Sequence, residues 1–198
     1  HAASRFPTPA LSRQQWRALI LTAAAVTLLV PAAARAAWQE IVGGPSPITH
    51  DAALEAVNPS IADVDGTLYV AWEAHPSASD YDVRVSKLDD TGTAWVDVGG
   101  ALNHAPTDNA FRPHVASIGG VPWVTWVEYD GTSQKVRVAR LNDAGTGWTE
   151  VVGGANPINH DANQNAWDPC LADVGGVPYV AWAEEPQPQA AESRIRVS

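Results

Sequence analysis

The chain has 198 residues, of which 45% are hydrophobic, and its nine tryptophans exclude a disordered chain, which lacks this much buriable surface. Fifteen glycines and 15 prolines argue against a helical bundle, because both residues destabilise helix interiors. The net charge is −10, and residues 37–198 carry 8 basic against 22 acidic residues, so phosphate is repelled and we expect no nucleic-acid partner.

Residues 1–36 have the pattern of an export signal. Arg13 and Arg17 precede an apolar run over 18–30, and Ala34-Arg35-Ala36 follows it. A positive flank, a short apolar core and a small-x-small exit are typical of a secretory signal peptide. The apolar run is about a dozen residues, short of the roughly 20 that span a bilayer. We therefore expect cleavage near Ala36, no stable membrane span, and a secreted (extracellular or periplasmic) protein.

The remainder, residues 37–198, is a repeat. Three stretches align without gaps, with spacings of 54 and 56 residues, and they run from Pro59 to Trp72, Pro113 to Trp126 and Pro169 to Trp182. Each predicts two strands joined by a two-residue turn that contains glycine. The second strand is apolar on both faces, which is typical of a strand between packed sheets. A second hairpin follows, with copies at 83–98 and 136–152.

Four strands in a repeat of roughly 55 residues indicate a β-propeller blade, with a sandwich or solenoid as the alternative. We expect an all-β propeller of four-stranded antiparallel blades, with about three blades' worth of strands present. The expected parts are a fourth strand and loop (37–58), two blades (59–112 and 113–168) and an incomplete blade (169–198). Natural propellers have four or more blades. The chain is then a fragment of a longer propeller, which the missing Met and the incomplete last blade favour, or two copies complete a six-bladed ring.

Two turn sequences, Asp90-Thr-Gly-Thr-Ala-Trp95 and Asp143-Ala-Gly-Thr-Gly-Trp148, each follow a Val-Arg-Val-x-x-Leu strand. This pattern resembles the kelch and Asp-box (sialidase-like) group of propellers over nearly all of 38–198. The resemblance implies the propeller architecture and carries no activity. Leu88 and Leu141 replace the Ser or Thr that opens an Asp box, and no diglycine follows the second strand as in kelch blades. In this group the Asp box is structural and lies opposite the usual binding face.

A histidine recurs in the loop from each fourth strand to the next first strand. The copies and their acidic neighbours are our ligand-binding candidates: His50, His104, His160, Asp51 and Asp161. In a propeller this loop belongs to the face that usually binds ligands. Imidazoles could coordinate a metal or bind a sugar, but copies in separate blades are held apart, whereas zinc needs nitrogen ligands at about 2.0–2.1 Å. We expect no metal site, and histidines that lock each blade to its neighbour through backbone hydrogen bonds.

Acidic residues follow each second strand, and Glu73, Glu128 and Glu184 are further binding candidates. Oxygen ligands of this kind could hold Ca²⁺, but the sequence has no calcium-binding motif, so we expect solvated loop ends and no cofactor. Trp167 and Phe111 precede a first strand, in what we predict to be a loop. They are either sugar-stacking platforms or plugs between blades, and Trp167 is the candidate for binding.

Other recurring residues have structural explanations. Three arginines recur in the third strand, where we expect them to stack on a tryptophan of the next blade rather than form a sialidase-like carboxylate clamp: Arg84, Arg137 and Arg196. Three aromatic residues share one register and are expected in the core: Tyr69, Trp123 and Tyr179. The single cysteine, Cys170, cannot form an internal disulfide, and we expect a buried, inert thiol.

The sequence contains no Gly-x-Ser-x-Gly, P-loop or His-Glu-x-x-His motif. We therefore predict a secreted, noncatalytic propeller module for binding or scaffolding, with a glycan or a cell-surface protein as its partner. The alternative is part of a secreted glycan-processing enzyme, sialidase-like or another glycosidase, whose site is completed by missing blades. A third interpretation is an inert adhesion spacer. A homodimer is expected if the chain is complete.

Overall fold

The computed structural model describes residues 48–49, 54–152, 157–185 and 192–198. Its eleven strands form three antiparallel sheets. The first blade contains β1 (Glu55–Val64), β2 (Thr67–Ser77), β3 (Asp80–Leu88) and β4 (Trp95–Asp97). The second contains β5 (Asn109–Ile118), β6 (Val121–Tyr129), β7 (Gln134–Leu141) and β8 (Trp148–Val152). The third contains β9 (Ala166–Val174), β10 (Val177–Glu184) and β11 (Arg194–Val197).

These sheets confirm the predicted fold class, an all-β propeller with four-stranded antiparallel blades. The described residues contain no helix, and so none that is long and apolar enough to cross a membrane. The expected export segment, the fourth-strand copy that starts at Trp38, and the candidates His50 and Asp51 lie outside the described residues.

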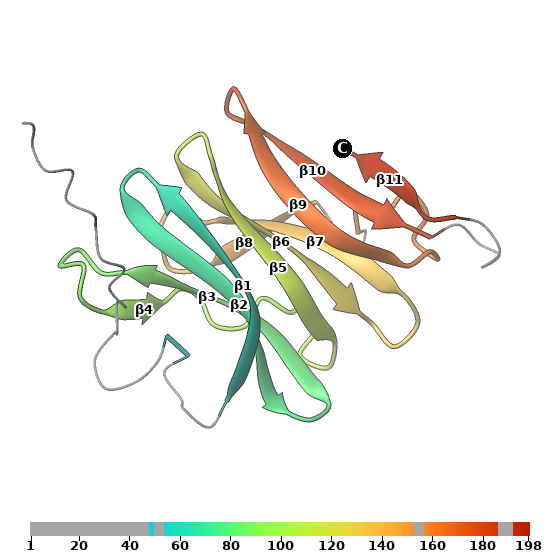
Figure 1. The fold of residues 1–198 in the computed structure, drawn as a ribbon, viewed down its shortest axis with the longest axis horizontal. Helices are drawn as coiled ribbons and strands as arrows, with labels where there is room; N and C mark the ends of the chain where they lie inside the picture. The colour runs from blue at the N-terminus through green and yellow to red at the C-terminus, as the bar shows by residue number, and fades with distance from the viewer. Residues whose placement is uncertain (1–47, 50–53, 153–156, 186–191) are drawn as a thin grey trace, which may run out of the picture. The chain divides into compact units, whose positions relative to one another are not determined.

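The first strands of the three blades, β1, β5 and β9, lie side by side (Figure 1). Neighbouring blades are joined here by a side chain of one strand and a backbone N–H of the next. Ser60 Oγ accepts a hydrogen bond from Val115 N–H at 3.1 Å. One blade further on, His114 Nδ1 accepts from Leu171 N–H at 3.1 Å. The same repeat position therefore forms both contacts, with a hydroxyl in one blade and an imidazole in the other.

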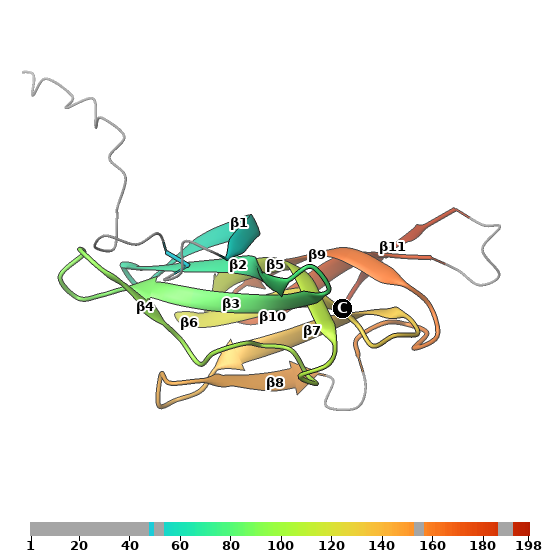
Figure 2. The same ribbon diagram turned by 90° about the horizontal axis from the view of Figure 1, so that it is seen from below.

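The core lies between the blades. Val83 and Val85 of β3 are buried with Trp126 of β6, and this cluster fills the space between the first and second blades. Between the second and third blades, Val136 of β7 packs in a cluster with Trp182 of β10. The second blade is covered on both faces, which explains why its strands are apolar on both faces. Figure 2 shows this blade from the side, with β5 at the top and β8 at the bottom.

Each first strand contains a bulge directly before its proline. The residues there have left-handed backbone conformations, with φ of 51° at Asn58, 53° at Arg112 and 51° at Asp168. The strand pairing shifts register at the same points. Asn and Asp tolerate this conformation, whereas arginine adopts it less readily. Because a bulge bends the strand and redirects side chains, it places three polar residues on neighbouring strands at one level.

The turns between third and fourth strands differ from the Asp-box expectation. Asp89, not Asp90, holds the first turn, because its Oδ1 accepts from Thr93 N–H at 2.9 Å. In the second blade Asn142 Oδ1 accepts from Thr146 N–H at 3.1 Å. The pKa of Asp89 is lowered by the hydrogen bonds that its carboxylate accepts from the backbone N–H of Thr93, the hydroxyl of Thr91 and the backbone N–H of Ala94. The residues that hold the two turns are thus Asp89 and Asn142, each one position before the aspartate (Asp90 or Asp143) of the Asp-box resemblance.

Candidate functional site

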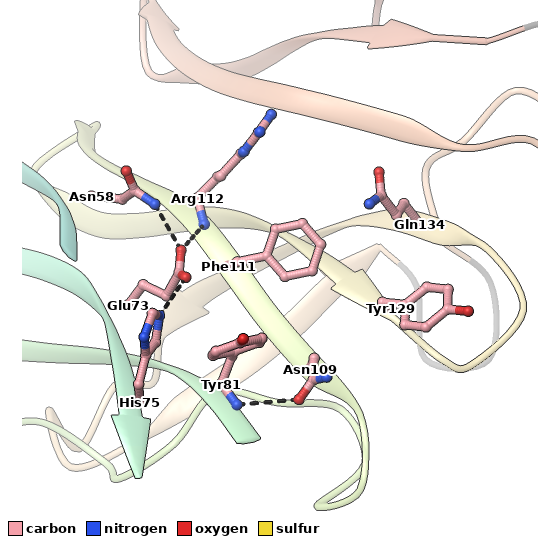
Figure 3. A pocket seen from close by; sticks show the side chains of 9 residues that line it. All are labelled: Asn58, Glu73, His75, Tyr81, Asn109, Phe111, Arg112, Tyr129 and Gln134. Carbon is pink, nitrogen blue, oxygen red and sulfur yellow. Dashed lines mark hydrogen bonds and ion pairs between the residues drawn. The ribbon is translucent and has the colours of Figure 1, made fainter. Parts of the chain in front are cut away.

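A groove runs along the bulged ends of the first strands. Its deeper part is a cavity of about 480 Å³ between the first and second blades (Figure 3). This part is lined by Asn58, Glu73, His75, Tyr81, Asn109, Phe111, Arg112, Tyr129 and Gln134. A shallower part of about 590 Å³ extends over β5 and β9, and it is lined by Asn58, Pro59, Arg112, Pro113, His114, Asp168 and Pro169. The two parts share Asn58 and Arg112, and we call them together the inner-strand groove.

Glu73 is the buried carboxylate of this groove. Its Oε2 accepts hydrogen bonds from Asn58 Nδ2 at 2.8 Å and from Arg112 N–H at 3.2 Å, and its Oε1 lies 2.7 Å from His75 Nε2 (Figure 3). Residues 73 and 75 alternate along β2 and therefore point to the same face. Asn58 and Arg112 reach the same carboxylate because each lies in a bulge. Three residues from three strands are thus fixed around one acid.

His75 bridges two acids. Its Nδ1 lies 3.3 Å from Glu55 Oε2, and its ring packs on Tyr81 with the centroids 4.4 Å apart. Burial lowers the pKa of His75, but the hydrogen bonds to Glu73 and Glu55 outweigh burial, so the pKa is raised above 6.5. The imidazole therefore keeps its proton to higher pH than an ordinary histidine and can supply it to the groove.

Arg112 connects the two carboxylates of the groove. Its backbone N–H binds Glu73, while its Nη1 donates to Asp168 Oδ1 at 2.7 Å across β5 and β9. This ion pair is open to solvent, with the side chains of Arg112 and Asp168 51% and 69% exposed. The groove thus holds one buried acid beside a histidine and one exposed acid beside an arginine. With Tyr81, Phe111 and Tyr129 in its wall, it offers both polar and aromatic surfaces to a ligand.

His114 lies at the shallow end of the groove. Burial lowers its pKa below 6.5. Its Nδ1 accepts a hydrogen bond from Leu171 N–H, so the neutral ring carries its proton on Nε2. This nitrogen is a donor, whereas the neighbouring Asp168 offers only acceptors.

Two of the predicted acids are structural. Glu128 and Glu184 are each 1% exposed and Glu73 is 7% exposed, so the expectation of solvated loop ends is wrong for all three. Both oxygens of Glu128 accept from His104 N–H at 3.0 Å, and Oε2 accepts from Trp126 Nε1 at 2.9 Å. Glu184 accepts from the backbone N–H groups of His160 and Asp161 at 2.9 and 3.0 Å. These carboxylates hold the histidine loops in place.

Glu73 is not a third copy of these acids. Glu128 and Glu184 are the second residue after their tryptophan, and the first blade has Ala74 in that position. Glu73 directly follows Trp72, so it points to the opposite face of its strand. The sequence pattern groups three acids, but only Glu73 lies in the groove.

The recurring loop is fixed by the residue before each histidine. Asn159 Oδ1 accepts from Val136 N–H at 2.8 Å, and its Nδ2 donates to the carbonyls of Gln134 and Gln164. Asn103 makes the equivalent bonds to the first blade. The expected lock between blades therefore exists, but asparagine side chains and histidine backbones form it. The side chain of His104 lies 2.8 Å from Glu150 instead.

The remaining candidates are scattered. Trp167 is half-buried inside β9 rather than in a loop, and its counterpart Phe111 lies in β5. Cys170 is exposed, so the expected buried thiol is wrong. Among the described residues, no three His, Cys, Asp or Glu side chains are placed to hold a metal ion.

Each recurring arginine lies directly across from the tryptophan of its own blade, not of the next one. The pairs are Trp72 with Arg84, Trp126 with Arg137, and Trp182 with Arg196. The three arginines are thus divided among three sheets and form no common clamp. The arginine of the groove is Arg112, which the sequence analysis did not select.

No family model matches the sequence, and neither does any curated protein sequence. Solved structures of glycoside hydrolases are similar to this chain, and two of them are described here. An α-L-arabinofuranosidase from Lactobacillus brevis has a TM-score of 0.51 and 16% identity, over 73% of this chain and 49% of that chain. A family 117 glycoside hydrolase from the marine bacterium Zobellia galactanivorans has a TM-score of 0.53 and 13% identity, over 80% and 56%. The chain spans about half the length of these proteins, and it has the β-propeller fold in common with them.

Proposed function

We propose that this chain is part of a secreted glycan-processing enzyme, a glycoside hydrolase whose substrate lies in the inner-strand groove. The observation that carries the proposal is the arrangement of Glu73 and Asp168, one buried and one exposed, on either side of Arg112. Glycoside hydrolysis commonly uses two carboxyl groups, one as a general acid and one as a base or nucleophile. Different surroundings are what assign such a pair to different roles.

In this proposal Asp168 is the carboxylate that activates water or attacks the sugar, and Arg112 orients it. Glu73 relays the proton of His75, to which it is hydrogen-bonded, to the leaving-group oxygen. The raised pKa of His75 supports this role, because the imidazole keeps its proton to higher pH than an ordinary histidine does. Export through the segment 1–36 belongs to the same proposal, since polysaccharides are extracellular substrates.

A noncatalytic glycan-binding module is the second candidate. The observation that favours it is that only Asp168 of the three bulge residues is an acid, while Asn58 and Arg112 occupy the other two positions. Amide, guanidinium and carboxylate groups with aromatic neighbours are what a sugar-binding site needs. Both candidates use the same groove and differ only in whether the glycosidic bond is cleaved.

The test is turnover of aryl glycosides by the full chain, starting with an aryl α-L-arabinofuranoside because one similar structure is an α-L-arabinofuranosidase. Asp168→Asn and Glu73→Gln are expected to lower kcat/KM by about 10²-fold or more. Asp143→Asn, with a 94% exposed side chain at the other end of its blade, is the matched control and is expected to leave kcat/KM unchanged. Calorimetric binding of arabino-oligosaccharides without turnover would favour the binding module, and neither binding nor turnover would overturn the proposal.

A further inference from the structure

The deeper part of the inner-strand groove has two halves, which are built from the same repeat positions of neighbouring blades. Figure 3 shows Glu73 and His75 on one side of β5, and Phe111, Tyr129 and Gln134 on the other side. We call the second group the aromatic half. The equivalent repeat positions are occupied by Glu73, His75 and Tyr81 in the first blade and by Val127, Tyr129 and Gln134 in the second. The second blade therefore repeats these positions without the carboxylate or the imidazole.

Gln134 presents an unused hydrogen-bonding group in the aromatic half. Its backbone is fully used, because its N–H donates to Asn165 Oδ1 at 2.9 Å and its carbonyl accepts from Asn159 Nδ2 at 3.0 Å. The side-chain Oε1 is buried and has no hydrogen-bond partner among the described residues. A buried acceptor without a donor is unfavourable, and such a group in a native structure usually has a functional reason. A hydroxyl group of a ligand would supply the missing donor.

Phe111 and Tyr129 provide the flat apolar surface of the aromatic half. Tyr129 is 40% exposed, and its hydroxyl donates to the Gly131 carbonyl at 3.0 Å, which holds the ring in place. Phe111 is half-buried in β5. The hydroxyl of Tyr129 is thus occupied, and the ring faces are what remains for a ligand. Aromatic faces beside a polar group suit a sugar ring, which has apolar C–H groups as well as hydroxyls.

The aromatic half is electrically neutral. None of the described residues that form it is charged, and the cations next to it in the chain are paired, Lys135 with Asp130 and Arg112 with Asp168. An acidic sugar would lose its hydration here without gaining a free cation, which is unfavourable. The lining therefore favours a neutral sugar over a uronic or sialic acid.

We propose that the aromatic half is a binding subsite for the neutral sugar next to the one that lies at Glu73. The substrate is then an oligosaccharide or polysaccharide of neutral sugars rather than a single glycosyl unit. This inference rests on the proposed function, because it takes the substrate of that hydrolase to lie in the same groove. Val127 stands at the position equivalent to Glu73, so this half binds a sugar without acting on it. Both halves belong to one cavity of about 480 Å³, so one sugar chain can reach both.

The test compares the binding of trisaccharides and monosaccharides to the full chain by titration calorimetry. The probes are arabinotriose, xylotriose and cellotriose, each with its methyl monoglycoside, and the Asp168→Asn background makes binding independent of cleavage. We expect at least one trisaccharide to bind about tenfold or more tightly than its monosaccharide. Tyr129→Ala and Gln134→Met are each expected to remove most of this difference. Tyr129→Phe, which keeps the ring, is expected to retain it.

Tyr179→Ala is the matched control for the loss of a tyrosine ring. The expected core position is confirmed for Tyr69, which is 7% exposed, but it is wrong for Tyr179, which is 42% exposed. Tyr179 lies in β10 and outside both parts of the groove. Its replacement is therefore expected to leave the affinities for both probes unchanged. Circular dichroism of every variant verifies that it is folded.

Three results would overturn the proposal. They are equal binding of the trisaccharides and their monosaccharides, a trisaccharide preference that Tyr129→Ala or Gln134→Met leaves intact, and no binding of any of the three trisaccharides. Hydrolysis of aryl glycosides without a preference for the longer chain would exclude the subsite and leave the proposed function standing. A preference for a trisaccharide without turnover would support the subsite and exclude hydrolysis.

Discussion

Glu128 accepts the backbone N–H of His104 on both of its carboxylate oxygens, each at 3.0 Å. The carboxylate is 1% exposed, and it comes from the second strand of the blade that the His104 loop enters. Asn103 ties the same loop to the preceding blade. A single loop is therefore held by a carboxylate on one side and an amide on the other, and the two blades are fixed through it.

Replacing Glu128 by alanine is expected to lower the free energy of unfolding by about 2–4 kcal/mol, because it leaves buried donors of His104 and Trp126 without an acceptor. Glu128→Gln, which keeps one oxygen, is expected to lose less. Urea unfolding followed by tryptophan fluorescence measures both values. Asp143→Ala is the exposed control and is expected to change stability by no more than about 0.5 kcal/mol. A loss in Glu128→Ala as small as in the control would show that the carboxylate does not hold the loop.

The architecture is readable from the sequence because it rests on local signals. Two-residue turns that contain glycine fix the hairpins, and apolar residues on both strand faces indicate packing on two sides. The repeat makes each of these signals appear three times. The strands nevertheless begin earlier than expected, β1 at Glu55 rather than at Pro59. The sequence does not reveal the bulge, because the repeated proline is most simply interpreted as the first residue of the strand. The left-handed residue before it is then assigned to a loop.

Asn159→Asp tests the other half of the loop attachment. The carboxylate would place an oxygen where Nδ2 now donates to the carbonyls of Gln134 and Gln164. Repulsion and two lost hydrogen bonds in a buried site are expected to lower stability by about 2–4 kcal/mol. Asn163→Asp, the same change on an exposed residue of the same loop, is the control. If the two variants unfold at the same urea concentration, the Asn159 side chain is not part of the attachment.

Alanine substitutions at Gly99 and Gly100 distinguish the effect of backbone strain from the effect of crowding by neighbouring atoms. Both have positive φ, 83° and 76°, so alanine is strained at either position. Only at Gly99 would the added Cβ meet other atoms, Gly147 Cα at 2.9 Å and Trp148 Cδ1 at 3.0 Å in the next blade. Gly99→Ala is therefore expected to lower the melting temperature clearly more than Gly100→Ala, measured by calorimetry. Equal losses would mean that the two blades can move apart at this point without cost.

The site was harder to predict than the fold because it depends on which face each residue occupies. Glu73 was selected from the sequence, but as one of three equivalent acids, and a one-residue difference from Trp72 puts it on the opposite face. Asn58, Arg112 and Asp168 were not selected, although each directly precedes a repeated proline. Their convergence requires three bulges on three neighbouring strands, which is a property of the packed blades and not of any single segment.

His114 should make stability depend on pH. Burial lowers its pKa below 6.5, so the unfolded chain binds this proton before the native protein does. Stability is therefore fully present above about pH 6.5 and falls as the pH decreases toward the lowered pKa. His114→Asn keeps an acceptor for Leu171 N–H but cannot titrate, so it is expected to lose less stability than the wild type between about pH 7.5 and 5. The urea midpoints of both proteins at both pH values give the stability that each protein loses. His75 is present in both proteins, so its contribution cancels when the two losses are compared. Parallel losses in the two proteins would show that His114 is protonated equally in the native and unfolded states.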